Sequence, residues 1–99
     1  MKKILTIVIL LSSIHLYGQK PVKVACIGDS VTYGSLIDDR ENNSYPAQLQ
    51  RMLGDRYEVA NFGKPSATVL KKGHCPYMES QEFTDAISFS GDIVSYTLD

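Results

Sequence analysis

The sequence lacks an excess of basic residues, an apolar run long enough to cross a membrane, and internal repeats or low-complexity tracts. Ten Lys and Arg against eleven Asp and Glu give a formal net charge of −1, so no electrostatic attraction to nucleic acid is expected. Histidine is scarce, and the pair His74 and Cys75 is too small a cluster for a metal site. The sequence therefore predicts no nucleic-acid partner, no metal and no cofactor.

Residues 1–18 have the layout of a secretory signal peptide. Lys2 and Lys3 precede the mostly apolar residues 4–11, and a cleavage point follows Gly18. A membrane anchor is the main alternative, but the apolar stretch is well short of the roughly 20 residues that span a bilayer. The pattern predicts a secreted or periplasmic protein, detached from the membrane after cleavage. It would then carry eight basic and eleven acidic residues, a formal charge of −3.

Residues 19–99 are few for the architecture that their pattern indicates. Doubly wound α/β domains typically need well over about 100 residues, so we expect these residues to be the amino-terminal part of a domain truncated after its third strand. Such a piece would leave strand edges open and helix faces uncovered. Cys26 and Cys75 could form a disulfide after export, although a cysteine inside a strand is more often a small buried hydrophobe.

Apolar periodicity predicts three strands alternating with two helices. The expected strands are 22–27, 57–61 and 92–98. The first expected helix, 45–53, is capped by Ser44 and ends at Gly54, and the second is 80–89. Residues 62–77 are expected to form a long loop. Helical spacing places Tyr45, Leu49, Met52 and Leu53 on one face of the first helix, and Phe83, Ala86 and Ile87 on the buried face of the second. The βαβαβ order predicts an α/β fold with a parallel sheet and right-handed crossovers.

Ser30 is the candidate nucleophile. It follows the strand 22–27 in the segment Ile27-Gly28-Asp29-Ser30, and therefore emerges at the carboxyl end of that strand, where open α/β sheets bind ligands. The polar turn after it would leave the Ser30 hydroxyl and N–H free to face a substrate. The alternative is that Ser30 caps the next helix or turn.

Four segments in order resemble the SGNH (GDSL-type) ester hydrolases. They are Gly28-Asp29-Ser30-Val31-Thr32-Tyr33-Gly34, Asn42-Asn43-Ser44, Tyr45-Pro46-Ala47-Gln48-Leu49 and Asn61-Phe62-Gly63. The resemblance covers nearly all of the chain after residue 20. It implies a flavodoxin-like three-layer α/β/α fold, a small-molecule ester substrate, and Ser30 as both nucleophile and oxyanion-hole donor.

The second oxyanion donor implied by the resemblance is Ser66. The family pattern Asn-x-Gly-x-Ser-Gly-x-Thr aligns on Asn61, Gly63 and Thr68, which puts Pro65 in place of serine and Ser66 in place of glycine. Ser66 can still donate its backbone N–H, but a side chain strains that position if it requires positive φ. Gly63 could replace Ser66 only through a register shift.

The remaining parts of the family's machinery have no match in this sequence. The family has Gly-x-Asn-Asp after the third strand and Asp-x-x-His near the end of the domain, whereas here Leu98 is followed by Asp99. His74 lies in the long loop, where a solvated residue is expected, and Lys71-Lys72 is most simply a solvated charge pair.

Three functions remain open from the sequence. The first is the amino-terminal part of an exported ester hydrolase, inactive by itself; the nearest resemblance is to members that act on acetylated carbohydrates, such as sialate O-acetylesterases. The second is a flavodoxin-like binding module, because residues 30–35 loosely resemble a phosphate-binding loop. The third is a non-catalytic remnant of a hydrolase.

Overall fold

A computed structural model describes residues 20–69 and 75–98. Five elements match the expected order: β1 (Val22–Gly28), α4 (Tyr45–Leu53), β2 (Tyr57–Gly63), α5 (Gln81–Phe89) and β3 (Ile93–Thr97). Three short elements were not predicted: α2 (Ser30–Tyr33), α3 (Arg40–Asn43) and the 3-10 helix η1 (Tyr77–Glu79). In this part of the chain, no helix has the length and apolar character needed to span a bilayer.

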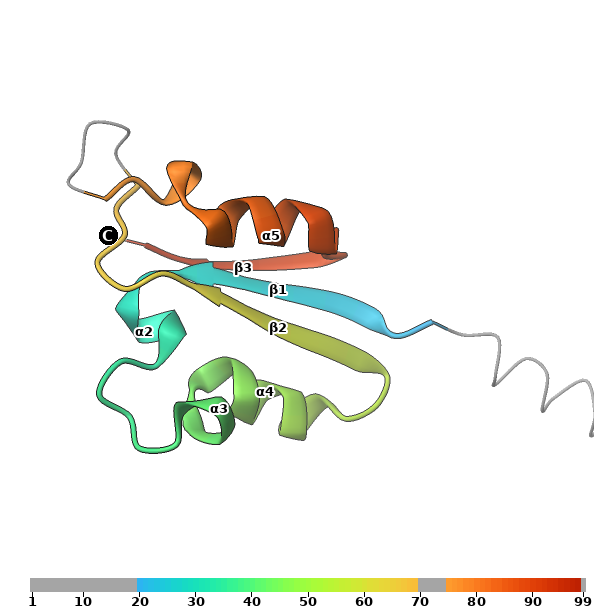
Figure 1. The fold of residues 1–99 in the computed structure, drawn as a ribbon. Helices are drawn as coiled ribbons and strands as arrows, with labels where there is room; N and C mark the ends of the chain where they lie inside the picture. The colour runs from blue at the N-terminus through green and yellow to red at the C-terminus, as the bar shows by residue number, and fades with distance from the viewer. Residues whose placement is uncertain (1–19, 70–74, 99) are drawn as a thin grey trace, which may run out of the picture.

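The strands form one parallel sheet in the order β2-β1-β3. Figure 1 shows α5 on one face of the sheet and α2, α3 and α4 on the other, which makes three layers. The predicted α/β class, with a parallel sheet of the flavodoxin-like kind, is confirmed. The central strand β1 supplies most of the core, with Val24, Ala25 and Cys26 at most 4% exposed.

The helix α4 packs on the sheet through only part of the face that apolar spacing predicts: Tyr45 contacts Thr32 and Cys26. Met52 is 82% exposed, whereas Gln50 faces the sheet. The Gln50 amide accepts from Val59 N (2.7 Å) and donates to Tyr57 O (2.8 Å), so its polar side chain fastens α4 to β2. A half-buried amide whose donors and acceptor are paired can occupy a position that faces the sheet.

The helix α5 begins as expected and covers the sheet only in part. The Ser80 hydroxyl accepts from Phe83 N (3.2 Å), and the Phe89 ring packs against Phe62 at 5.4 Å. Ile87, expected in the core, is 62% exposed. The helix packs mainly over β1 and β2, and Ile87 lines an open apolar pocket together with Val94 of β3.

The strand β3 has an open edge and exposed apolar side chains. Ile93, Val94 and Tyr96 are 50%, 57% and 59% exposed. The expectation that a three-strand sheet leaves its edge and helix faces uncovered is confirmed.

The two cysteines are both free. Cys26 is fully buried in β1, and this burial raises the pKa of its thiol, partly offset by a hydrogen bond with Tyr45. The structure favours Cys26 as a small buried hydrophobe over a disulfide partner of Cys75.

Tyr77 should make stability depend on pH in the alkaline range. Its side chain is 2% exposed, and its hydroxyl donates to Phe62 O (2.5 Å). Burial, and then the negative charge of Glu82, raises the pKa of Tyr77 from 10.0 to about 12. Because the folded pKa is the higher one, its contribution is present below pH 10 and is lost as the pH rises through 12.

We expect the free energy of unfolding to fall by about 2 kcal/mol over that interval because of Tyr77. Urea denaturation at a series of pH values measures it, with Tyr77→Phe as the control that lacks the titrating group. The same alkaline loss in both proteins would assign the effect to other residues.

Candidate functional site

The carboxyl ends of all three strands meet at one edge of the sheet. Gly28 at the end of β1 pairs with Gly63 of β2 and with Thr97 of β3. Lys64 N donates to Gly28 O (2.9 Å), and Asp29 N donates to Thr97 O (3.2 Å), so the loops leaving β1 and β2 start side by side. The structure therefore brings the segments of Ser30 and Ser66 to the same edge.

Ser30 is the first residue of α2, and its neighbour Asp29 is the cap. Asp29 Oδ1 accepts from Val31 N (3.1 Å), which is the interaction that a capping side chain makes. Ser30 is half-buried, and among the described residues neither its hydroxyl nor its N–H has a hydrogen-bond partner. The capping alternative for Ser30 therefore does not hold in this structure, and both groups remain available.

Two polar residues, the buried Thr32 and the half-buried Asn61, hold α2 in place. The Thr32 side chain is fully buried, and its Oγ1 lies 3.2 Å from the Tyr45 hydroxyl of α4. Asn61 of β2 donates from Nδ2 to Thr32 O (2.8 Å). The motif marks Thr32 and Asn61, but their positioning role follows only from these contacts.

Gly63 is poorly placed to replace Ser66 as an oxyanion donor. Its N–H donates to Asn61 Oδ1 (2.9 Å), so it is already engaged. A Cβ at Gly63 would lie 2.2 Å from Tyr33 N, because β2 runs directly under α2. Glycine is required here by close packing.

Ser66 has a positive φ. The sequence predicts that a side chain at this position is strained if its φ is positive, and the structure meets that condition. Ala67 N donates to Lys64 O (3.1 Å), closing a four-residue turn in which Pro65 is second and Ser66, with φ 67°, is third. This is the pattern of a type II turn, which favours proline at the second position and glycine at the third. Pro65 is thus accommodated, and Ser66 carries the strain; its N–H has no partner among the described residues.

We expect Ser66→Gly to stabilise the protein by about 1 kcal/mol, because glycine adopts positive φ without the steric cost of a Cβ. Pro65→Ser should destabilise it by about 0.5 kcal/mol through the greater freedom of the unfolded chain. Urea midpoints of the two single variants measure both effects. Destabilisation by Ser66→Gly would contradict the assignment of strain to this residue.

Several residues considered in the sequence lie outside the described residues. They are His74, the pair Lys71-Lys72, and Asp99. In the part of the chain that the structure describes, no three His, Cys, Asp or Glu side chains form a group that could hold a metal ion.

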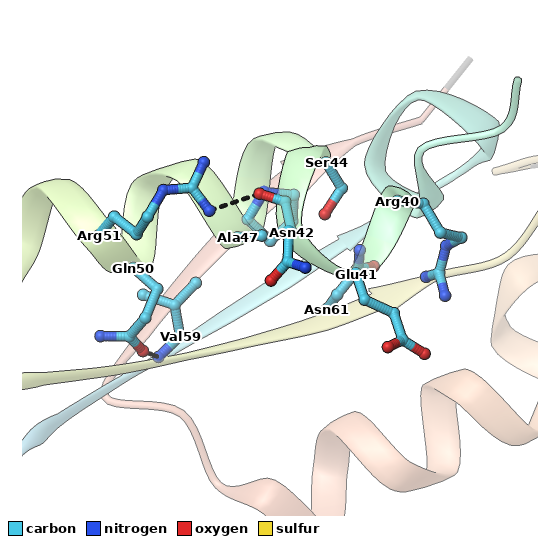
Figure 2. Close-up of a pocket in the computed structure, with 10 residues that line it drawn as sticks. Arg40, Glu41, Asn42, Ser44, Ala47, Gln50, Arg51, Val59 and Asn61 are labelled. Atoms are coloured by element: carbon cyan, nitrogen blue, oxygen red, sulfur yellow. Dashed lines mark hydrogen bonds between the residues drawn. The ribbon is translucent and has the colours of Figure 1, made fainter. Parts of the chain in front are cut away.

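A separate pocket of about 470 Å³ lies between α3, α4 and β2. Figure 2 shows Arg40, Glu41, Ser44 and Asn61 around it, and neither Ser30 nor Ser66 lines it. The sequence did not indicate this pocket, because α3 has only four residues and shows no periodicity. Ser44 was expected only as a helix cap.

The chain is similar to a segment of an acetylxylan esterase from Xylanibacter ruminicola. The two are 48% identical over 84 residues, which are 85% of this chain and 18% of the esterase. This chain therefore spans about a fifth of that relative's length. No protein family model matches the chain, and no solved structure matches it. The predicted resemblance to an ester hydrolase is confirmed at the level of an esterase segment.

Proposed function

We propose that this chain is the nucleophile-bearing part of an exported SGNH-type serine esterase that removes acetyl groups from a carbohydrate. The observation that carries the proposal is Ser30 at the carboxyl end of β1: Asp29 takes the cap, and the hydroxyl and N–H of Ser30 have no partner in the part of the chain that the structure describes. The similarity to an acetylxylan esterase supports an acetyl ester on a xylan-like saccharide as the substrate. Residues 1–18 would be the export signal; they lie outside the described residues.

In the proposed reaction, Ser30 Oγ attacks the acetyl carbonyl carbon and its proton passes to a general base. The carbonyl oxygen becomes an oxyanion, which the N–H groups of Ser30 and Ser66 would stabilise. Collapse releases the protonated sugar hydroxyl and leaves an acetyl-Ser30 ester, which water hydrolyses to acetate and free Ser30.

This chain supplies the nucleophile and the oxyanion donors, and the base must come from elsewhere. The sequence contains no Asp-x-x-His and no Gly-x-Asn-Asp. General base catalysis alone contributes about 10²–10⁴-fold, so its loss removes most of the activity. A hydrolase remnant without catalysis is the second candidate, and the strained Ser66 favours it.

We expect the 99-residue chain to show no Ser30-dependent hydrolysis of an aryl acetate. The comparison is between this chain and its Ser30→Ala variant, with Ser88→Ala on the exposed side of α5 as the matched control. A clear rate difference between the chain and Ser30→Ala would show that another group, such as His74, acts as the base. A bound yellow chromophore in the purified protein would instead support the binding-module alternative.

A further inference from the structure

Tyr77, the first residue of η1, donates hydrogen bonds at both ends of the segment that carries Ser66. Its hydroxyl donates to Phe62 O (2.5 Å), which lies just before the turn 64–67. Its backbone N–H donates to Thr68 O (2.9 Å), which lies just after that turn. One residue therefore holds the two carbonyls that flank the turn. In Figure 1 the loop that follows β2 runs up to the segment that leads into η1.

Tyr77 is itself fixed by the start of α5. Its side chain is 2% exposed, and its ring packs edge to face on the Phe83 ring, with 5.9 Å between the centroids. Tyr77 O accepts from the Ser80 hydroxyl (2.6 Å), which also caps α5. Burial raises the pKa of Tyr77 to about 12, so its hydroxyl remains a donor at neutral pH. The packing and capping of α5 thus set the position from which Tyr77 holds the turn.

The turn 64–67 needs this support because its backbone is strained. Ser66 has φ 67°, at which a side chain is unfavourable, and the turn is closed by the hydrogen bond from Ala67 N to Lys64 O (3.1 Å). A residue in an unfavourable conformation persists only where its surroundings hold it there. Released at one end, the turn would relax toward negative φ and reorient the Ser66 N–H.

We propose that Tyr77 is a positioning residue that holds the Ser66 N–H in the orientation of an oxyanion donor. In this role it acts through the backbone of the turn and not on the substrate itself. The use of the Ser66 N–H in catalysis rests on the proposed function, whereas the two hydrogen bonds of Tyr77 to the flanking carbonyls do not.

The first measurement is amide hydrogen exchange in the full chain and in Tyr77→Phe, which keeps the ring and removes only the hydroxyl. Relative to the amide of Cys26 in the centre of the sheet, we expect the amides of Ala67 and Thr68 to exchange about three- to tenfold faster in the variant, as for the loss of one neutral hydrogen bond. Tyr57→Phe, at the opposite end of β2, is the matched control and should leave all three rates unchanged.

Two results of the exchange experiment would overturn the proposal. An equal acceleration at Ala67, Thr68 and Cys26 in Tyr77→Phe would show that the hydroxyl stabilises the whole fold and not the turn. Unchanged rates at Ala67 and Thr68 would show that the turn keeps its conformation without the hydroxyl.

The second measurement uses a chimera in which this chain replaces the matched segment of the acetylxylan esterase. An oxyanion donor acts in the transition state, so Tyr77→Phe should lower kcat for an aryl acetate about three- to tenfold and leave KM unchanged. The control Tyr57→Phe should change neither. An unchanged kcat in Tyr77→Phe, where Ser30→Ala abolishes activity, would overturn the role of Tyr77 alone. Activity that survives Ser30→Ala would refute the proposed function, and the exchange rates would still decide whether Tyr77 holds the turn.

Discussion

Replacing Gly63 by alanine is expected to destabilise the protein by about 3 kcal/mol, because there is no room for a side chain. The added Cβ would lie 2.2 Å from Tyr33 N, 2.7 Å from Tyr33 Cα and 2.8 Å from Thr32 C. All three are backbone atoms, so neither partner can rotate away. The backbone of α2 would have to move, and Ser30 would move with it.

The measurement is the free energy of unfolding by urea for Gly63→Ala. Gly54→Ala is the control, since a Cβ there meets nothing within 4 Å and only its φ of 78° opposes alanine. That purely conformational penalty is about 1–2 kcal/mol. If Gly63→Ala lowers the free energy of unfolding no more than Gly54→Ala does, the close contact between α2 and Gly63 of β2 is contradicted.

Local patterns were sufficient to predict the long elements of the fold. The strands β1, β2 and β3 and the helices α4 and α5 lie within two residues of the expected bounds, because each has a clear apolar periodicity with a cap or glycine stop. The helices α2 and α3 have four residues each, which is too short for a period to be read. Polar contacts from residues of other elements hold them: Asn61 donates to Thr32 O of α2, and Arg51 donates to Asn42 O of α3.

Burial was less predictable than secondary structure. Met52 and Ile87 are apolar residues at helical spacing, but whether they are buried depends on the layers that surround them. Gln50 occupies the core-facing side of α4 because two strand residues satisfy its amide, and no periodicity rule can identify such a pairing.

The candidate site was predictable in position and less so in detail. The location of Ser30 follows from the strand before it and from parallel topology. Asp29 and Ser30 are both good capping residues, so only the structure decides which one caps α2. The sequence alone does not give the φ of Ser66, so it predicts backbone strain there only for a positive φ; the structure supplies that value.

Substituting this chain for the matched segment of the Xylanibacter ruminicola esterase should give a protein whose acetyl esterase activity depends on Ser30. The matched segment is 18% of that protein. Under the proposed function, the base, its orienting carboxylate and the cover for the edge of β3 must come from the remainder. Removing a serine nucleophile from a complete site lowers kcat by at least about 10³-fold, because the acyl intermediate can no longer form. We therefore expect Ser30→Ala to reduce kcat/KM for an aryl acetate by that factor in the chimera. Ser88→Ala, an exposed serine outside the proposed site, is the control and should leave kcat/KM unchanged.

The Ser66 turn can be tested in the same chimera. Loss of a complete oxyanion donor costs about 3 kcal/mol, or about 100-fold in kcat, so relief of a strained donor should recover part of that range. We expect Ser66→Gly to raise kcat/KM about three- to tenfold and Pro65→Ser to leave it unchanged, because only Ser66 has a positive φ. Equal kcat/KM values with serine and glycine at position 66 would show that this turn does not limit the oxyanion hole. Activity that survives Ser30→Ala would show that the reaction is carried by another part of the relative, and Ser30 would then lose its proposed role.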